Sequence, residues 1–392
     1  MGSPIAMQAA GRKRAAAMIG RLQAPEVFFT GTFTPAQTLL IPRTLNLTRP
    51  LESLQIQLRF RLTVTVAAYT AVAPEAPQNI LQKIIINGTH RAFGAVTPYN
   101  ISGATMFAWQ RIFQAVGGDA LVSVNGGALT RLADADRPFV SGFAGTVATH
   151  DFIVTYILPT SPQLGIGQAA KRNLNGFLWM PQDWADSLQI QLQFGDATSF
   201  GDTTGATTAL AGFGGTANPT IEIDANYSIL GQAANSVKAG VVLRQENLLT
   251  GFTTVTQQNR LTALQKRITT SLVLKAGVNQ AAALTTAGTQ TFASLSDLQL
   301  DRTQIQVDNK PVRNVNSNLI EKAYYQKMFN TIIPGGYFLL SFVDAQNPIL
   351  AYRGDQLSGG STFEIISDVD EANAANLQTF VQEQVIGGDF PQ

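Results

Sequence analysis

The chain lacks several residue types and segments that define particular classes of protein. None of its 392 residues is cysteine, which excludes disulfide frameworks, thiolate zinc sites and cysteine nucleophiles. Its two histidines, His90 and His150, lie in unrelated turn-like contexts without metal-site spacing, and we expect ordinary loop histidines. The chain also has no run of roughly 18 uncharged apolar residues and no apolar N-terminal run typical of a secretory signal. We therefore expect neither a membrane span nor Sec export.

Charged residues are also scarce. They make up 14% of the chain, with a formal net charge of +1, whereas soluble domains average roughly 25% charged residues. This balance argues against a nucleic-acid-coating surface, which needs a basic face to displace counterions, and we predict no specific nucleic-acid recognition. Hydrophobic residues make up 45% of the chain, which excludes disorder and favours a large core, organised as two domains.

One basic cluster stands at the N-terminus. Residues 5–22 are rich in alanine and are typical of an amphipathic helix, because the apolar and basic side chains separate onto two arcs at about 100° per residue. The apolar arc holds Met7, Met18, Ile19 and Leu22, and the basic arc holds Arg12, Lys13, Arg14 and Arg21. Such a helix can bind an anionic membrane surface or dock on a partner. A solvated tail that orders only within an assembly is the alternative.

From Val27 onward the pattern changes to short period-two runs separated by Gly, Pro, Asn and Asp, which predicts strands. The clearest runs in the first half are SLQIQLRFRLTVTV, LQKIIING, DFIVTYILP, SLQIQLQF and TIEIDANY. The second half repeats the texture in LQKRITTSLVL, DRTQIQVD, GYFLLSFVD and STFEIIS. Two strand-rich blocks of similar design therefore follow one another. Residues 377–386 fit either a strand or a helix by periodicity alone.

Two segments within these blocks look helical: ISGATMFAWQRIF, ending at Phe113, and NSNLIEKAYYQKMF, ending at Phe329. The second has capping-box spacing from Asn318 to Glu321. Each follows a strand and a turn signal, Asn87-Gly88 in the first block and Asp308-Asn309 in the second. Strand, turn and helix thus recur with an offset of about 220 residues, which indicates a duplicated unit. A coincidence between two β-rich halves is the alternative.

The sequence contains no converging catalytic set. It has no phosphate-binding Gly-Lys-Ser/Thr loop, and GFGGTANP reads as a flexible loop. Asp134 and Asp136 could face one side of an extended segment, but solvated loop acids are the better interpretation. Trp109, Trp179 and Trp184 favour core or interface packing over a sugar-binding cleft. We therefore predict no enzyme, no cofactor and no metal.

The order of segments resembles a known family. The similarity lies in LLIPRTLNLTRPLESLQIQLRFRLTVT, ILQKIIINGTHRAF, FLWMPQDWADSLQIQLQFGDATSF and TIEIDANYSILGQ, then in GVVLRQENLLTGFTTVTQQNRLTALQKRITTSLVL and STFEIISDVDEANAANLQTFVQEQVI. Taken together they resemble the double jelly-roll major capsid proteins of tailless, membrane-containing icosahedral bacteriophages of the tectivirus type, in the adenovirus-hexon lineage. The resemblance covers most of the chain and depends on the order of many weak matches. It implies that residues 377–386 form a strand.

The resemblance implies an all-β chain of two tandem eight-stranded jelly rolls, with short flanking helices and an N-terminal amphipathic helix. The expected division is an arm at 1–25, a first roll at 26–232, a linker at 233–240 and a second roll at 241–392.

It also implies a location and a set of partners. The protein would assemble in the host cytoplasm as pseudo-hexagonal homotrimers and reside in the virion. Its partners would be itself, neighbouring trimers, penton or minor capsid proteins, and the lipids of an internal membrane. The arm residues expected to meet lipid or a partner are Arg12, Lys13, Arg14, Met18, Ile19, Arg21 and Leu22. Another virion β protein, such as a spike, receptor-binding or tail component, is the first alternative, and a polysaccharide-active β enzyme is the second.

Overall fold

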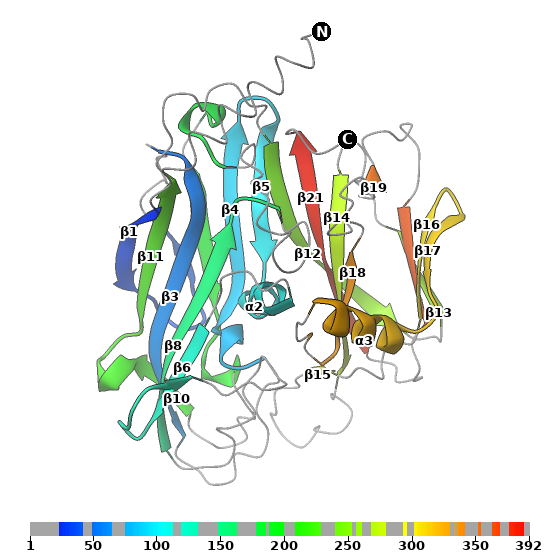
Figure 1. The fold of residues 1–392 in the computed structure, drawn as a ribbon. Helices are drawn as coiled ribbons and strands as arrows, with labels where there is room; N and C mark the ends of the chain where they lie inside the picture. Colours follow the sequence, from blue (N-terminus) through cyan, green and yellow to red (C-terminus); the bar gives the residue numbers. More distant parts are fainter. Residues whose placement is uncertain are drawn as a thin grey trace.

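The computed structural model describes residues 23–41, 49–64, 75–112, 119–131, 148–162, 178–185, 188–199, 208–228, 240–252, 256–260, 268–279, 293–295, 302–329, 333, 335–341, 352–353, 363–368 and 376–387. Strands dominate these ranges, which contain two α-helices. Figure 1 shows most of the strands standing upright in layers that follow one another across the molecule. The predicted arm residues, from Arg12 to Leu22, lie outside the described ranges.

The first half forms a sandwich of two sheet layers, which we name the first sandwich. One layer is a seven-stranded sheet in the order β1-β11-β3-β8-β6-β7, with β10 paired to β3. The facing layer has the order β5-β4-β9-β2. The strands are β1 (Gln23–Thr32), β2 (Thr38–Leu40), β3 (Leu51–Val64), β4 (Leu81–His90), β5 (Gly94–Ile101), β6 (Asp119–Val124), β7 (Thr130–Arg131), β8 (Ala148–Pro159), β9 (Gln189–Phe194), β10 (Thr208–Gly212) and β11 (Thr220–Ser228).

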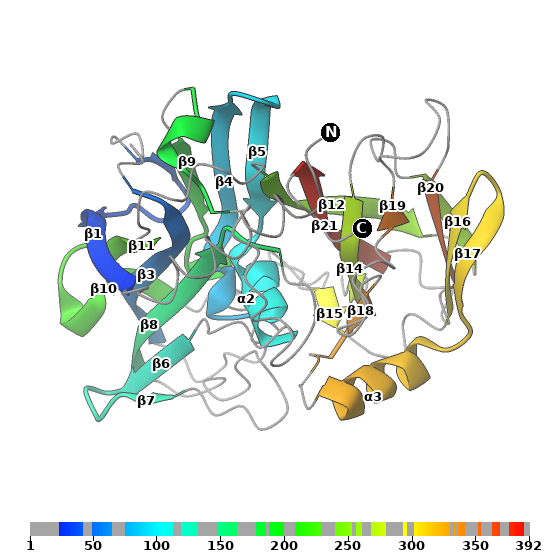
Figure 2. The same cartoon turned by 45° about the horizontal axis from the view of Figure 1, so that its top comes forward.

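The second half repeats the arrangement as a second sandwich. Its β12, β21 and β14, with β15, β18 and β19 beside β14, extend the β5-β4-β9-β2 layer into one ten-stranded sheet. A four-stranded sheet, β13-β20-β16-β17, forms its other layer (Figure 2). The strands are β12 (Gly240–Phe252), β13 (Thr256–Arg260), β14 (Ile268–Asn279), β15 (Ala293–Leu295), β16 (Arg302–Val307), β17 (Lys310–Val315), β18 (Tyr337–Ser341), β19 (Tyr352–Arg353), β20 (Phe363–Asp368) and β21 (Asn376–Gly387).

The period-two runs of the sequence form the core of the first sandwich. On β3, Leu54, Ile56, Leu58 and Phe60 are at most 1% exposed, and they join one apolar cluster with Ile84 of the facing layer. The same cluster contains Phe152, Val154 and Tyr156 of β8 and Leu188, Ile190, Leu192 and Phe194 at β9. Alternation places every second side chain on one face of a strand, so the apolar sets predicted from the sequence are buried. The strand predicted at residues 377–386 is also confirmed, as β21.

Both predicted helices are present, as α2 (Gly103–Ile112) and α3 (Asn318–Phe329). The capping-box prediction is wrong, because Asn318 is not the N-cap of α3. The N–H of Glu321 donates to the carbonyl of Ser317, so Ser317 is the N-cap and Asn318 is the first helical residue. The N–H of Met106 likewise donates to the carbonyl of Ser102, which makes Ser102 the N-cap of α2.

One of the two predicted turns is wrong. Asn87 and Gly88 lie inside β4 at a register shift, and a Cβ at Gly88 would come within 2.5 Å of Leu188. The glycine is needed there for close packing, not for a turn. The chain turns instead at residues 91–93, ahead of Gly94 with its φ of 74°.

The second predicted turn is confirmed. Asp308 and Asn309 both have positive φ values, 51° and 61°, as a two-residue hairpin turn requires. The duplicated unit is therefore a hairpin followed by a helix. It comprises β4, β5 and α2 in the first sandwich and β16, β17 and α3 in the second.

Candidate assembly surfaces

A buried arginine joins the two sandwiches where β5 and β12 pair in parallel. Arg244 of β12 has no exposed surface, and it pairs in register with Tyr99 of β5. Its Nη1 donates to the Tyr99 hydroxyl at 2.6 Å and to the Pro159 carbonyl at 2.7 Å. Its Nη2 donates to the Ser161 carbonyl at 2.8 Å. The guanidinium therefore fastens the second sandwich to the end of β8 in the first.

A carboxylate from the second sandwich caps the helix of the first. Glu246 of β12 accepts a hydrogen bond from the Ser102 N–H at 2.6 Å and another from the Thr105 hydroxyl at 2.7 Å. The Ser102 hydroxyl also accepts from the Thr105 N–H at 3.3 Å. An anion at a helix N-terminus meets unsatisfied N–H groups and the positive end of the helix dipole. This contact therefore stabilises α2 and the junction together.

A second carboxylate crosses the junction in the opposite direction. Glu75, which precedes the short helix η1 (Gln78–Ile80) of the first sandwich, accepts from the Tyr337 hydroxyl at 2.6 Å and pairs with Lys275 at 2.5 Å. Burial, with the charge of Glu75, raises the pKa of Tyr337 well above its ordinary value. The phenol consequently remains protonated and acts as a donor. Each sandwich thus supplies one carboxylate that the other satisfies.

Aromatic rings line the first sandwich close to this junction. Trp179 lies 5.5 Å from Trp184 and 6.5 Å from Tyr99, measured between ring centroids in edge-on geometry. All three tryptophans are at most 5% exposed, so the packing role predicted for Trp109, Trp179 and Trp184 is confirmed. The glycine at position 88 admits the Trp184 ring to this cluster.

The prediction of loop histidines is wrong. His90 ends β4, His150 lies within β8, and they are 2% and 1% exposed. His90 stacks on Phe93 at 4.5 Å between centroids and meets the edge of Trp184 at 5.3 Å. Burial lowers the pKa of both imidazoles, although the charge of Asp151 opposes the shift at His150. Sequence reasoning failed here because the residues beside each histidine show only a weak period-two pattern. The inward position of each histidine on its strand was therefore not evident.

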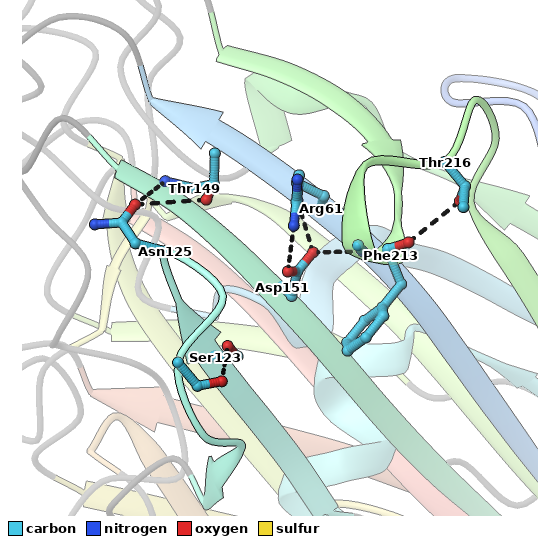
Figure 3. Close-up of polar contacts among 9 residues, drawn as sticks. Arg61, Ser123, Asn125, Thr149, Asp151, Phe213 and Thr216 are labelled. Carbon is cyan, nitrogen blue, oxygen red and sulfur yellow. Dashed lines mark hydrogen bonds and ion pairs between the residues drawn. The ribbon is translucent and has the colours of Figure 1, made fainter.

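One end of the first sandwich is held by polar contacts that the sequence did not suggest (Figure 3). Arg61 of β3 donates to both carboxylate oxygens of Asp151 on β8, at 2.8 and 2.6 Å. The N–H of Gly214 donates to the same carboxylate at 2.9 Å. Gly214 belongs to the short helix η6 (Phe213–Gly215) within GFGGTANP, so this predicted loop is hydrogen-bonded to β8 at that residue. The glycine at 214 has a φ of 69°, which suits glycine best.

The β6 hairpin is fastened to the same end. The Asn125 N–H donates to the Thr149 carbonyl at 2.8 Å, and the Asn125 side chain accepts from the Thr149 N–H at 3.0 Å. The Ser123 hydroxyl donates to the Gly127 carbonyl at 2.6 Å. Figure 3 shows these contacts on one side of Asp151. On the other side, the Thr216 hydroxyl donates to the Phe213 carbonyl. Hydrogen bonds therefore hold the loops at this end of the sandwich in defined positions.

Several large apolar side chains nonetheless remain exposed. Three of them, Leu319, Ile320 and Tyr324, lie on α3, with 42%, 72% and 53% of their surface accessible. The others are Val27 on β1, Leu40 on β2, and Val124 and Leu129 at the β6–β7 hairpin. Apolar side chains gathered on one helix face are typical of a contact surface.

The remaining candidates give no chemical site within the described ranges. Asp134 and Asp136 lie outside them. Among the residues that the structure describes, no three His, Asp or Glu side chains gather so that they could hold a metal ion. No helix in that part of the chain is long and apolar enough to cross a membrane.

Comparison with known proteins identifies the fold. No protein-family model and no curated protein sequence matches the chain. Solved structures do match: the major capsid protein of Sulfolobus turreted icosahedral virus has a TM-score of 0.58 at 11% identity, covering 94% of this chain and 97% of its own. The PBCV-1 virus capsid protein has a TM-score of 0.53 at 11% identity, with 94% and 95% covered. The major capsid protein of bacteriophage PM2 has a TM-score of 0.52 at 8% identity, with 93% and 97% covered.

These matches define the class of architecture. The chain has the all-β double jelly-roll fold of viral major capsid proteins, as the sequence predicted. Each sandwich described above is one jelly roll. The count of eight strands in each roll and the N-terminal helix stay predictions.

Proposed function

We propose that this chain is a major capsid protein. It would assemble as pseudo-hexagonal homotrimers into an icosahedral shell over an internal membrane, as a structural component of the virion without catalytic residues. The observation that carries the proposal is the match of the whole double fold, over more than nine-tenths of both chains, to capsid proteins of three viruses. The two sandwiches share one continuous sheet, which suits a capsid subunit whose two jelly rolls keep a fixed relative position.

The proposed division follows the sequence: an arm at 1–25, a first roll at 26–232, a linker at 233–240 and a second roll at 241–392. The first strand of each roll begins just ahead of these limits, at Gln23 and Gly240. Low charge fits lateral contacts between tiles, because charges at the centre of an obligate interface must be desolvated. Penton or minor capsid proteins would meet the outer edges of the trimers.

The trimer is the first test. Light scattering on the purified protein should give three chains of 42.0 kDa, about 126 kDa in total. Trimers should persist at micromolar concentration, because obligate interfaces bury roughly 2,000–5,000 Å² and dissociate little. A stable monomer at that concentration would rule out the shell function.

The proposed membrane contact of the arm is tested separately. Replacing Arg12, Lys13, Arg14 and Arg21 with Gln should leave the folded trimer intact and weaken binding to anionic liposomes by at least about tenfold. The reason is that each basic residue near an anionic surface contributes roughly 1 kcal/mol. Liposome flotation measures the effect.

The matched control removes four cations from the sandwiches instead, by replacing Arg59, Lys83, Arg91 and Lys310 with Gln. This control should bind anionic liposomes like the wild type. Equal binding by the arm variant and the wild type would favour the solvated-tail interpretation of the arm.

A further inference from the structure

The two helices of the duplicated unit differ in how far they are covered. Aligning their N-caps, Ser102 and Ser317, places each exposed apolar residue of α3 opposite a buried residue of α2. The pairs are Ala104 with Leu319, Thr105 with Ile320, and Trp109 with Tyr324; their exposed fractions are 2% against 42%, 1% against 72%, and 0% against 53%. The same helix positions are therefore covered in one sandwich and open in the other.

The second sandwich helps to cover α2. Thr105 donates to Glu246 of β12, and the buried Tyr337 of β18 belongs to the same apolar cluster as Ala104 and Trp109 of α2. In Figure 1, α2 lies between the two sandwiches, whereas α3 lies along the lower edge of the second. Meanwhile Lys322 of α3 is only 5% exposed and lies 5.5 Å from the Phe338 ring centre. The helix thus buries Lys322 and Tyr325 and exposes Leu319, Ile320 and Tyr324, and apolar side chains exposed together on a helix favour an apolar cover over them.

The strand that supplies this cover has a counterpart in the first sandwich. Glu246, Thr250 and Gly251 of β12 recur in β1 as Glu26, Thr30 and Gly31, each 220 residues earlier. The two strands also hold the same place in their sheets. In each sandwich the first strand pairs antiparallel with the last, β1 with β11 and β12 with β21. Glu26 is therefore the positional equivalent of the glutamate that caps α2.

The second edges of these strands differ. The strand β12 pairs with β21 on one side and with β5, the strand before α2, on the other. Within the described ranges, β1 ends its sheet, and so does β17, the strand before α3. The carboxylate of Glu26 is 59% exposed and forms a surface ion pair with Arg49 of its own chain. The first sandwich thus exposes β1, the equivalent of the strand that covers α2. The second sandwich exposes α3, the equivalent of α2 itself.

We propose that the β1 edge of one chain docks on α3 of a second copy, with Glu26 capping the N-terminus of that helix as Glu246 caps α2. Val27, which is 57% exposed beside Glu26, would then lie against the apolar face of Leu319, Ile320 and Tyr324. This inference rests on the proposed self-assembly and specifies its contact.

The occupant must be a second copy rather than the same chain. Figures 1 and 2 both place β1 at the outer edge of the first sandwich and α3 beside the second, with strands of both sandwiches between them. A contact between two different patches is heterologous, and it closes into a ring when the rotation between copies permits. If the contact between chains repeats the contact within a chain, every sandwich in the ring meets its neighbour in the same way. Pro25 occupies the position of Gln245 and has no N–H to donate, so side chains would provide more of this contact than a strand ladder.

Cross-linking tests the proposal directly, because the chain has no cysteine of its own. The variants Val27→Cys and Ile320→Cys are prepared singly and also co-expressed, and each sample is treated with a short bis-maleimide. Covalent dimers should form in the co-expressed sample and be at least tenfold scarcer in either single variant. Replacing Val27→Cys by Val124→Cys, an exposed site on the β6 hairpin, should abolish the product.

The outcomes separate this inference from the proposed function. Dimers from one variant alone would indicate a two-fold contact and overturn the docking proposal. Trimers by light scattering without the mixed cross-link would also overturn it and leave the capsid function standing. A monomer would overturn both.

The capping role has its own readout. Glu26→Gln should raise the trimer dissociation constant by at least tenfold, whereas Glu222→Gln, on the neighbouring β11, should leave it unchanged. Equal dissociation constants for the two variants would exclude the capping role.

Discussion

Replacing Arg244 with Met should lower the free energy of unfolding by about 3–5 kcal/mol, the usual cost of removing one side of a buried charged contact. The guanidinium has no exposed surface and donates to Tyr99, Pro159 and Ser161. Methionine fills part of the volume but donates no hydrogen bond. The Pro159 carbonyl keeps the Tyr99 hydroxyl as a donor, whereas the Arg244 donor to the Ser161 carbonyl is lost, and an unsatisfied buried group costs about 1–3 kcal/mol. Urea denaturation followed by tryptophan fluorescence measures the change.

Two further variants isolate the role of this side chain. Arg59→Met, on exposed β3 surface, should change the stability by no more than about 0.5 kcal/mol. Arg244→Lys should fall between the two, because an ammonium keeps the charge but lacks the planar fork that reaches acceptors on separate segments. A loss below about 1 kcal/mol for Arg244→Met would mean that the junction does not depend on this contact.

The sequence predicts the sheets better than the junction between them. Strands such as β3 and β8 alternate strictly, so period two alone identifies which side chains are buried. In contrast, Arg244 is the one basic residue in VVLRQENLL, where four consecutive polar residues separate two apolar stretches. Its partners lie 83, 85 and 145 positions away in the chain. Local periodicity carries no information about such contacts, although two opposite charges, Arg244 and Glu246, between apolar stretches are a signal worth following.

The errors at turns have a related cause. Asn-Gly is the strongest local signal for a hairpin turn, yet Gly88 serves the close approach of Trp184 and Leu188. Propensity describes what a dipeptide permits, and tertiary packing decides how it is used. At Asp308 and Asn309 no such packing competes, and the local preference is realised. The strands β5 and β17 were missed for a similar reason. Pro98 and Pro311 interrupt the strand pattern, so both segments read as turns.

The duplication was visible in the sequence, but its meaning required the structure. The sequence showed a strand, a turn and a helix repeated about 220 residues apart. Only the hydrogen bonds of Glu246 to α2 reveal why the equivalent Glu26 matters. A repeated motif becomes informative when one copy contacts a helix of its own chain and the other, with its Glu26 paired to Arg49, stays at the surface.

The second large effect is expected at the end of the first sandwich. Asp151→Asn should lower the free energy of unfolding at pH 7 by about 1.5–3 kcal/mol, the usual value of hydrogen bonds to a charged group. Asp151 is 4% exposed and Arg61 is 20% exposed, so the pair is only partly open to water. The loss would free both Arg61 and the Gly214 turn, and urea denaturation measures it.

The lowered pKa of Asp151 determines how its stabilising effect changes with pH. Burial alone would raise the pKa of Asp151, but the hydrogen bonds from Arg61 and Gly214, with the charges of Arg61 and His150, lower it below its ordinary value of 3.8. A lowered pKa in the folded state means that the stabilisation is complete above about pH 4 and is lost as the pH falls through the folded pKa. The difference between wild type and Asp151→Asn should therefore shrink below pH 3.8.

Asp224 provides a control of opposite sign on the same sheet. Burial, with the charge of Glu222, raises the pKa of Asp224 above its ordinary value, so folding disfavours the charged form. Asp224→Asn should therefore keep or slightly increase the stability at pH 7, and its advantage should disappear in acid as the wild-type carboxylate becomes protonated. If Asp151→Asn behaved like Asp224→Asn across this range, the ion pair with Arg61 would not hold the end of the sandwich. The surface presented there would then depend on the hairpin contacts of Asn125 and Thr149 instead.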